Sequence, residues 1–287
     1  MSNTINSGLL SKAIQDAVLA TLKAEPIAIK DVCKMDASTE ATKAGKVTVP
    51  FIDTSNVTSA TFSGSYADED LVISPKDITM KEEYISLSLN GFELQSYDLP
   101  KMEAIVADAT RILAQKVESD VYAVVTAGNY TNKVVCTAAN VAGSTLTELR
   151  TDLVSAGVPQ PLAVVLNPDA NAALIEDVGD ASKFGSADPA QNGFVGNCRG
   201  LKVYEAANLT DTGFALGKDA ILVASRGVFS EPGIYMDLVT FQDPKTGIVF
   251  TIKSYASGAA NAIKHVLSVR YGVAVGNADA LVRLADA

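Results

Sequence analysis

The sequence has one histidine, three cysteines and no tryptophan among its 287 residues, and these shortages exclude several kinds of site. With His265 alone, zinc sites that use two histidine ligands are excluded, and the H-E-x-x-H motif of zinc proteases is absent. Cys33, Cys136 and Cys198 are far apart and form no C-x-x-C pair. We interpret them as small apolar side chains in a reducing compartment, and we expect no metal and no cofactor.

Catalytic motifs are also lacking. A Ser-His-Asp triad would need His265, which lies beside apolar residues in an alternating segment and is interpreted as a packed or surface side chain. Residues 213–218 resemble a phosphate-binding loop, but the segment is one residue short and Asp219 stands where Ser or Thr would bind magnesium. Acidic residues 68–70 and 177–180 lack the ligand spacing of a calcium loop. We therefore expect no catalytic, cofactor-binding or metal-binding residue, and no enzyme.

Basic residues are too few for a surface that grips nucleic acid. The chain has 33 acidic and 23 basic side chains, a net charge of −10 and no run of Lys or Arg. Sequence-specific binding of DNA or RNA normally needs a basic face, so the balance argues against it. No apolar run reaches transmembrane length, and the N-terminus lacks the basic and apolar segments of a signal peptide. We expect no membrane partner.

Apolar residues, in contrast, make up 48% of the chain, and the mean hydropathy is +0.19. This is apolar for an acidic protein. One explanation is a core rich in Ala and Val, and the other is apolar surface that further subunits cover. We favour the second explanation.

The segment 85–128 is the most informative one. It begins with the period-two alternation of a half-buried strand, and Asn90-Gly91 then indicates a tight turn or bulge. Asp98 and Pro100 are suited to open a helix, and apolar residues then recur at three- and four-residue steps until Gly128 ends it. A long helix that follows an extended hairpin, with no catalytic motif nearby, indicates a building element.

The flanking segments favour a mixed fold with projecting parts. Residues 1–50 read as an arm, with a short amphipathic helix and then little periodicity in 31–50; such an arm is disordered or lies on something else. A hairpin within 51–97 would be marginal alone and would need a neighbour, and residues 81–83 read as a strand edge that charge protects from pairing. Further helices are predicted at 145–156 and 170–177, strands at 162–166, 200–204, 220–224, 237–241, 248–255 and 262–275, and a long loop at 179–196.

The order of these elements resembles the major capsid proteins of tailed bacteriophages, the Hong Kong 97 fold. In this resemblance, residues 85–125 are similar to the extension loop and spine helix of the family. Residues 196–210 resemble the strand after the loop of the axial domain, and residues 258–284 resemble the closing strands. The likeness spans roughly residues 50–287 and depends on order and spacing rather than on one motif.

The resemblance implies an α+β fold and a structural role. The subunit would self-assemble into pentamers and hexamers of an icosahedral head that encloses double-stranded DNA without sequence-specific binding. It would be assembled in the host cytoplasm and located in the virion, with scaffolding, portal and decoration proteins as further partners. The implied parts are an N-terminal arm (1–50), an extension loop (51–97), a peripheral domain with the spine helix and long strands (98–130 and 236–270) and an axial domain (131–235 and 271–287).

The resemblance also leads to expectations about proteolytic cleavage and covalent crosslinks between subunits. Because only residues 1–50 precede the extension loop, we expect no cleavage, and a separate scaffolding protein or none. Some members of the family form Lys–Asn crosslinks, and Lys76 or Lys81 with Asn277 are conceivable partners. We interpret all three as ordinary solvated side chains.

Two alternatives stay open at this stage. The first is a cellular nanocompartment shell on the same fold, which would hold an enzyme in place of DNA. The second is a soluble α/β enzyme or binding domain, which predicts a small monomer or dimer rather than large particles.

Overall fold

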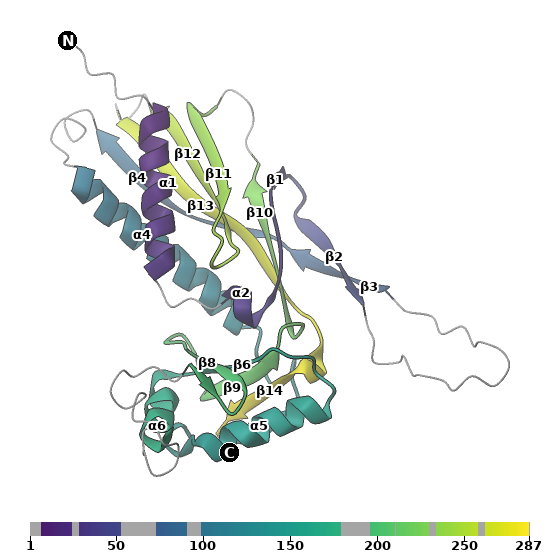
Figure 1. Ribbon diagram of the computed structural model, residues 1–287. Coiled ribbons are helices and arrows are strands. Elements are labelled where there is room, and N and C mark those ends of the chain that lie inside the picture. The colour runs from purple at the N-terminus through teal and green to yellow at the C-terminus, as the bar shows by residue number, and fades with distance from the viewer. Residues whose placement is uncertain are drawn as a thin grey trace, which may run out of the picture.

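The computed structural model describes residues 7–24, 29–52, 73–90, 99–178, 196–209, 211–229, 234–257 and 262–286. Two bodies lie one above the other, and a ribbon projects from the side of the upper one (Figure 1). Each body is built on a six-stranded sheet, and the ribbon is a two-stranded sheet. Among the described residues, no helix is both long and apolar enough to cross a membrane.

The upper body is a sheet with helices across one face (Figure 1). β4 pairs with the first part of β13 on the side away from β12, so β13 has neighbours on both sides. The long helix α4 (Leu99–Tyr122) lies on the sheet, and α1 (Ser7–Ala24) crosses it and also contacts β11 and β12. The strands are β1 (Lys34–Thr42), β10 (Ile221–Val228), β13 (Ala262–Val275), β12 (Val249–Ser257), β11 (Asp237–Gln242) and β4 (Lys81–Asn90).

The lower body is a second sheet flanked by α5 (Gly143–Ser155) and α6 (Pro168–Val178). Its central strand β6 (Leu162–Leu166) is apolar and buried at every position, as a strand covered on both faces should be. β6 lies between the parallel β8 (Leu201–Glu205) and the antiparallel β9 (Gly213–Gly217). The remaining elements are β5 (Lys133–Val135), β7 (Asn197–Cys198), β14 (Leu281–Ala285) and the short 3-10 helices η1 (Ala138–Asn140) and η2 (Ala278–Ala280).

The ribbon consists of β2 (Lys46–Ile52) and β3 (Ile73–Thr79), which pair antiparallel. The short helix α2 (Ile29–Val32) precedes β1 near the junction of the two bodies. One hydrophobic cluster runs from α1 through α4 and the upper sheet into the lower sheet. A second, small cluster lies under the base of the ribbon.

Elements with a strong apolar pattern form where the sequence predicts them. The buried strand 162–166, the helix around 145–156, the hairpin of β11 and β12 and the long strand 262–275 are all present. The long helix ends at Tyr122 rather than at Gly128. The next residues turn so that buried Tyr130 donates a hydrogen bond from its hydroxyl to the carbonyl oxygen of Ala220, at 2.8 Å.

Within the first fifty residues, α1 packs on the upper body and β1 belongs to its sheet. Buried residues of α1 join the core of their own subunit, and Lys245 in the β11–β12 turn donates to the last turn of α1, 3.0 Å from the carbonyl oxygen of Lys23. The segment with little periodicity forms β1, which pairs parallel with β10. This strand lacked an apolar alternation because most of its side chains stay partly exposed, and pairing with β10 holds it in place.

Residues 81–90 lie in the upper sheet as β4 and do not belong to the ribbon, which begins at Lys46. Among the described strands β4 pairs with β13 alone, so residues 81–83 do lie on a sheet edge. Residues 53–72 of the expected hairpin, the turn after Asn90 and most of the loop 179–196 lie outside the described residues.

Candidate assembly surfaces

The face of the upper sheet opposite α1 and α4, which we call the open face, carries exposed apolar side chains on and beside β4 and β11. The pairing register brings Ser86, Val266, Lys253 and Leu238 into one row across four strands on this face. Nearby, Tyr84 is 64% exposed, and Ile234 and Met236 are similarly exposed. Clusters of exposed apolar side chains are characteristic of surfaces that bind other proteins.

A shallow groove of about 320 Å³ lies on this open face. The rings of Tyr235 and Tyr255 meet edge to face, with centroids 5.9 Å apart. Lys253 Nζ forms an ion pair with Glu82 at 2.8 Å, and only 10% of the lysine side chain is exposed. The lining residues, which we call the sheet groove, are Glu82, Tyr84, Ile234, Tyr235, Lys253, Tyr255 and Val266. Tyrosines in such a groove offer apolar ring area and a hydroxyl to a partner.

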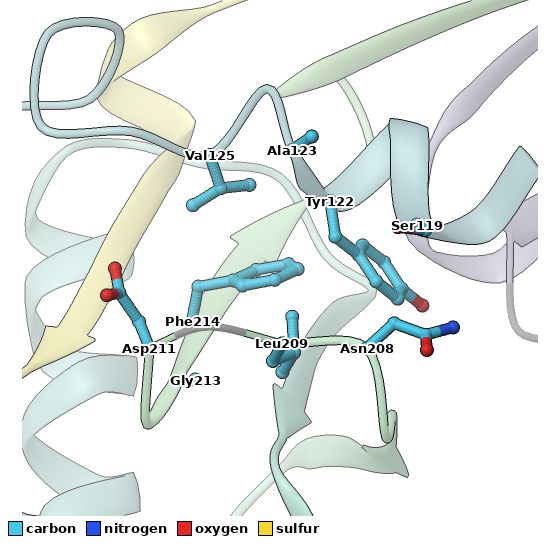
Figure 2. A pocket seen from close by; sticks show the side chains of 9 residues that line it. All are labelled: Ser119, Tyr122, Ala123, Val125, Asn208, Leu209, Asp211, Gly213 and Phe214. Carbon is cyan, nitrogen blue, oxygen red and sulfur yellow. The ribbon is translucent and has the colours of Figure 1, made fainter. Parts of the chain in front are cut away.

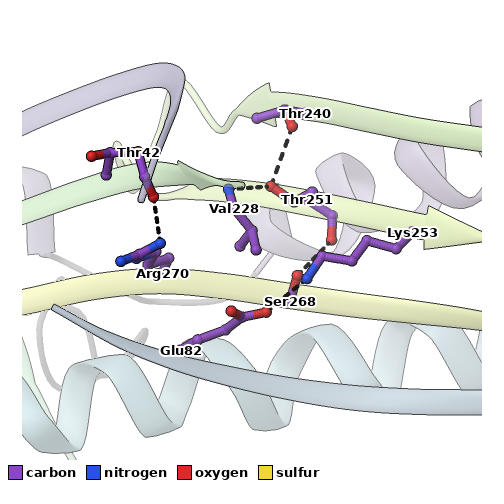
Figure 3. Close-up of polar contacts among 8 residues, drawn as sticks. All are labelled: Thr42, Glu82, Val228, Thr240, Thr251, Lys253, Ser268 and Arg270. Atoms are coloured by element: carbon purple, nitrogen blue, oxygen red, sulfur yellow. Dashed lines mark hydrogen bonds and ion pairs between the residues drawn. The ribbon is translucent and has the colours of Figure 1, made fainter. Parts of the chain in front are cut away.

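Beside the sheet groove the open face is polar, and its side chains bond one another (Figure 3). The hydroxyl of Thr251 accepts from the N–H of Val228 at 3.2 Å and lies 3.3 Å from the hydroxyl of Thr240. The hydroxyl of Ser268 donates to the carbonyl oxygen of Thr251. These polar groups are satisfied within the subunit, so the apolar groove is the part of this face that gains most from a partner.

The ribbon leaves the upper body and extends away from it (Figure 1). Thr48 donates a hydrogen bond to Asp77 across the two strands at 2.8 Å. Further out, Pro50 lies opposite Pro75, and neither has an N–H to donate. A two-stranded ribbon is marginal in water by itself, and prolines discourage additional strands from pairing with it.

The only histidine of the chain is packed in the core. His265 Nδ1 lies 2.9 Å from the hydroxyl of Ser254, and Asp237 pairs with Ser254 on the next strand. Burial lowers the pKa of His265, although the charge of Asp237 opposes this shift. The sequence did not indicate this Asp-Ser-His row because strand register creates it. His265 and Ser254 are 3% and 1% exposed, so no substrate reaches them and the row is no catalytic triad.

The other sequence segments considered for chemistry have structural roles. Residues 213–217 form β9, a buried strand and no phosphate loop. Asp177 accepts a hydrogen bond from the N–H of Gly143, at the start of α5. Cys33 and Cys198 are buried, as predicted, and Cys136 is partly exposed. Within the described residues no cluster of His, Cys, Asp or Glu could hold a metal ion.

The residues considered for crosslinking have partners inside the subunit. Lys81 forms an ion pair with Asp120, and the side chain of Asn277 accepts a hydrogen bond from the N–H of Asp279 at 3.0 Å. Lys76 lies half-buried in β3, within the ribbon. We expect uncrosslinked chains, so the subunits of assembled particles should run as monomers on denaturing gels.

A small cavity of about 110 Å³ lies where the end of α4 meets β9 (Figure 2). Tyr122 and Phe214 face each other across it, with ring centroids 5.5 Å apart. Asp211 lies at its rim but forms an ion pair with Arg283, at 2.7 Å. The cavity therefore lies at the junction of the two bodies and has too little chemistry for a substrate site.

Solved structures with this fold come from viral and virus-like shells. The capsid of cyanophage P-SCSP1u superposes with a TM-score of 0.61 at 12% identity, covering 90% of this chain and 87% of that one. The virus-like particle of Pyrococcus furiosus gives 0.59 at 14% identity, over 95% and 98% of the two chains. A chain of Mycobacterium phage Che8 gives 0.56 at 15% identity, over 84% of each chain. The fold is thus the Hong Kong 97-like capsid fold.

Sequence comparison identifies the family. The family model described as phage capsid protein matches residues 93–284, and the chain belongs to this family. A search of curated proteins finds no match. The protein is therefore a capsid shell protein with a structural role and not an enzyme, which confirms the interpretation of its sequence and removes the soluble-enzyme alternative.

Proposed function

We propose that the protein is the major subunit of an icosahedral phage head, built from its pentamers and hexamers, that encloses double-stranded DNA. The observations that carry the proposal are a ribbon that projects from the upper body and an exposed sheet groove on the same subunit. Contacts between two different patches close into rings when the rotation between subunits allows it. Rings of this kind are the units from which a shell is made.

In this proposal the ribbon of one subunit lies on the open sheet face of the next. The part of the ribbon beyond Val49 gains a packing partner, and the sheet groove loses its exposed apolar area. Apolar burial contributes about 25 cal/mol per Å², and each subunit takes part in several contacts at once, so modest interfaces add up to a stable particle. The division into arm, extension loop, peripheral and axial domains is part of the same proposal.

The proposal also covers the enclosed DNA and the partner proteins of the shell. A subunit with a net charge of −10 would enclose DNA without holding it, because few lysines and arginines are available to displace counterions. Scaffolding, portal and decoration proteins are the partners that such a head needs, with assembly in the host cytoplasm and the product in the virion.

A nanocompartment is the second candidate function, and one comparison favours it. The virus-like particle of Pyrococcus furiosus matches over 98% of its own chain. The two functions differ in the cargo, so nucleic acid in purified particles supports the phage head, whereas particles that hold only protein support the nanocompartment.

The experiment is light scattering and electron microscopy of the purified protein and of groove variants. We expect closed particles from the wild-type protein. Tyr84→Ser together with Ile234→Ser should abolish them, because both side chains line the sheet groove. Ile112→Ser is the matched control, since Ile112 is 56% exposed on α4, on the other side of the sheet. A wild-type protein that stays monomeric or dimeric overturns the proposal, and particles formed equally by the groove variant overturn the role of the groove.

A further inference from the structure

Three consecutive residues of β13, 270–272, contact the root of the ribbon, by which we mean residues 42–46 and 78–81. Gly272 lies directly beneath it. A Cβ atom at this position would be 2.4 Å from the carbonyl oxygen of Thr79 and 2.6 Å from Cγ2 of Ile78. Real Cβ atoms do not approach other atoms so closely, so the absence of a side chain lets the ribbon cross β13 at this distance.

Arg270 holds the strand that enters the ribbon. Its guanidinium donates to the carbonyl oxygens of Thr42 and Ala44, the latter at 2.7 Å. The contact with Thr42 is visible in Figure 3. The N–H of Met80 donates to the carbonyl oxygen of Gly45 at 2.9 Å, which joins the entering and the leaving strand. The planar guanidinium fixes two carbonyls at once, and this constrains direction as well as position.

Tyr271 contacts the strand that leaves the ribbon. Its side chain lies on the face of the sheet that α4 covers, opposite to that of Arg270. Its buried hydroxyl donates to Asp120 of α4. Lys81, the first residue of β4, bonds the same carboxylate and lies over the Tyr271 ring, 5.0 Å from its centroid. Lys116 is the third donor to Asp120, at 3.0 Å. The carboxylate therefore ties α4, β4 and β13 together where the chain passes from the ribbon into the sheet.

The charge of this carboxylate is itself stabilised. Burial would raise the pKa of Asp120, but the hydrogen bonds from Lys81, Tyr271 and Lys116 outweigh burial and hold the pKa below its ordinary value. A neutral asparagine at position 120 would keep the shape of the side chain, but its NH2 group cannot accept a hydrogen bond, and the bonds to its one oxygen would be weaker than those to an ionised acceptor.

We propose that residues 270–272 of β13, together with Asp120, form a pivot that sets the direction of the ribbon and thereby the angle between neighbouring subunits. The assembly part of this inference rests on the proposed function. β2 has seven residues and is about 24 Å long at about 3.4 Å per residue, so a rotation of about 10° at the root moves its far end by about 4 Å. Such a shift is large compared with the tolerance of packed contacts, so the pivot would determine shell curvature.

The test uses Asp120→Asn and Gly272→Ala, with Asp108→Asn as the matched control. Asp108 is an exposed carboxylate on the same helix, and it pairs with Arg111 away from the root. In electron micrographs we expect the control to give particles of wild-type diameter. The two pivot variants should lose the single wild-type diameter and give mixed diameters or open sheets.

A second measurement follows the ribbon without assembly. Spin labels at Pro50→Cys in the outer half of the ribbon and Gln115→Cys on α4, with Cys136→Ser to remove the partly exposed native thiol, report the ribbon direction in dilute protein. We expect one narrow distance distribution in the otherwise unchanged protein, and a shifted or broadened one in each of the two pivot variants. If Gly272→Ala does not fold, Arg270→Lys replaces it, because an ammonium cannot hold both carbonyls in the same plane.

The outcomes separate this inference from the proposed function. Particles absent from the wild-type protein contradict the proposed function, while the label distance still tests the pivot. Wild-type diameter and wild-type label distance in both pivot variants overturn the pivot itself.

Discussion

The position of α1 gives the sharpest test of this subunit, because the same helix could pack on its own subunit or on a neighbour. The perturbation is Leu22→Ala. Leu22 is fully buried in the core, together with Val18 and nearly all of Ile14. If α1 belongs to its own subunit, truncating Leu22 leaves a cavity in that subunit. If α1 instead packs on a neighbouring subunit, Leu22→Ala should leave the stability of the unassembled protein unchanged.

The size of the effect follows from burial. Replacing a fully buried leucine by alanine costs about 2–5 kcal/mol, because apolar contacts are lost and the cavity fills only partly. Taking about 3 kcal/mol and a denaturant slope of about 3 kcal/mol per M for a chain of this size, the urea midpoint should fall by about 1 M. A loss of about 3 kcal/mol is a large share of the free energy of unfolding of a typical domain, which is about 5–15 kcal/mol.

The assay is urea unfolding of the unassembled protein, followed by circular dichroism. Lys12→Ala is the control, because Lys12 is an exposed side chain of the same helix. We expect the control midpoint to stay within about 0.2 M of wild type, as for most surface substitutions. A Leu22→Ala midpoint equal to that of wild type, with particle formation lost, would refute the reasoning and place α1 on a neighbouring subunit.

Two further predictions concern the cores of the two bodies. Because burial lowers the pKa of His265 below its unfolded value of 6.5, the unfolded chain binds the extra proton first on acidification. The free energy of unfolding should thus fall as pH drops below about 6.5, by at most about 1.4 kcal/mol per pH unit, and His265→Asn should flatten this slope; equal slopes would contradict it. In the lower body, a Cβ on Gly213 would lie 2.5 Å from the carbonyl oxygen of Val165, whereas Gly45 has open space around it. Gly213→Ala should cost about 1–3 kcal/mol and lower the melting temperature by several degrees, with Gly45→Ala as control; matching melting curves would show that β6 and β9 can separate.

Sequence patterns predicted those helices and strands whose apolar side chains pack against the core. The strand 162–166 is buried on both sides, and the hairpin of β11 and β12 was indicated by two apolar segments on either side of a turn that contains Pro244 and Gly247. β1 has no such pattern, since pairing with β10 and not burial defines it, so it read as irregular chain. The docking of α1 was missed for a related reason. An amphipathic helix shows that a face is covered, but the pattern does not say by which subunit.

The candidate surfaces could be predicted only in part. High apolar content indicated covered surface, yet the sheet groove needs Tyr84, Tyr255 and Ile234 from three separate segments. The register of β4, β12 and β13 brings the two tyrosines onto one face, and the chain leading into β11 adds Ile234. The link between Asp120 and Lys81 is likewise invisible in the sequence, because no spacing rule connects a helix residue with the first residue of a strand in another segment.

β13 shows how one strand can serve both folding and assembly. Its odd-numbered residues from His265 to Tyr271 face the helices and are buried, whereas even-numbered residues such as Val266 and Arg270 lie on the open face with the sheet groove and the ribbon root. Because side chains alternate along a strand, a substitution at an odd position such as Leu267 should act on stability, whereas one at Val266, which lines the sheet groove, should act on association. A slip of the register by one residue would exchange the two sets, so the pairing of β13 with β4 and β12 must be fixed before any subunit can bind the next.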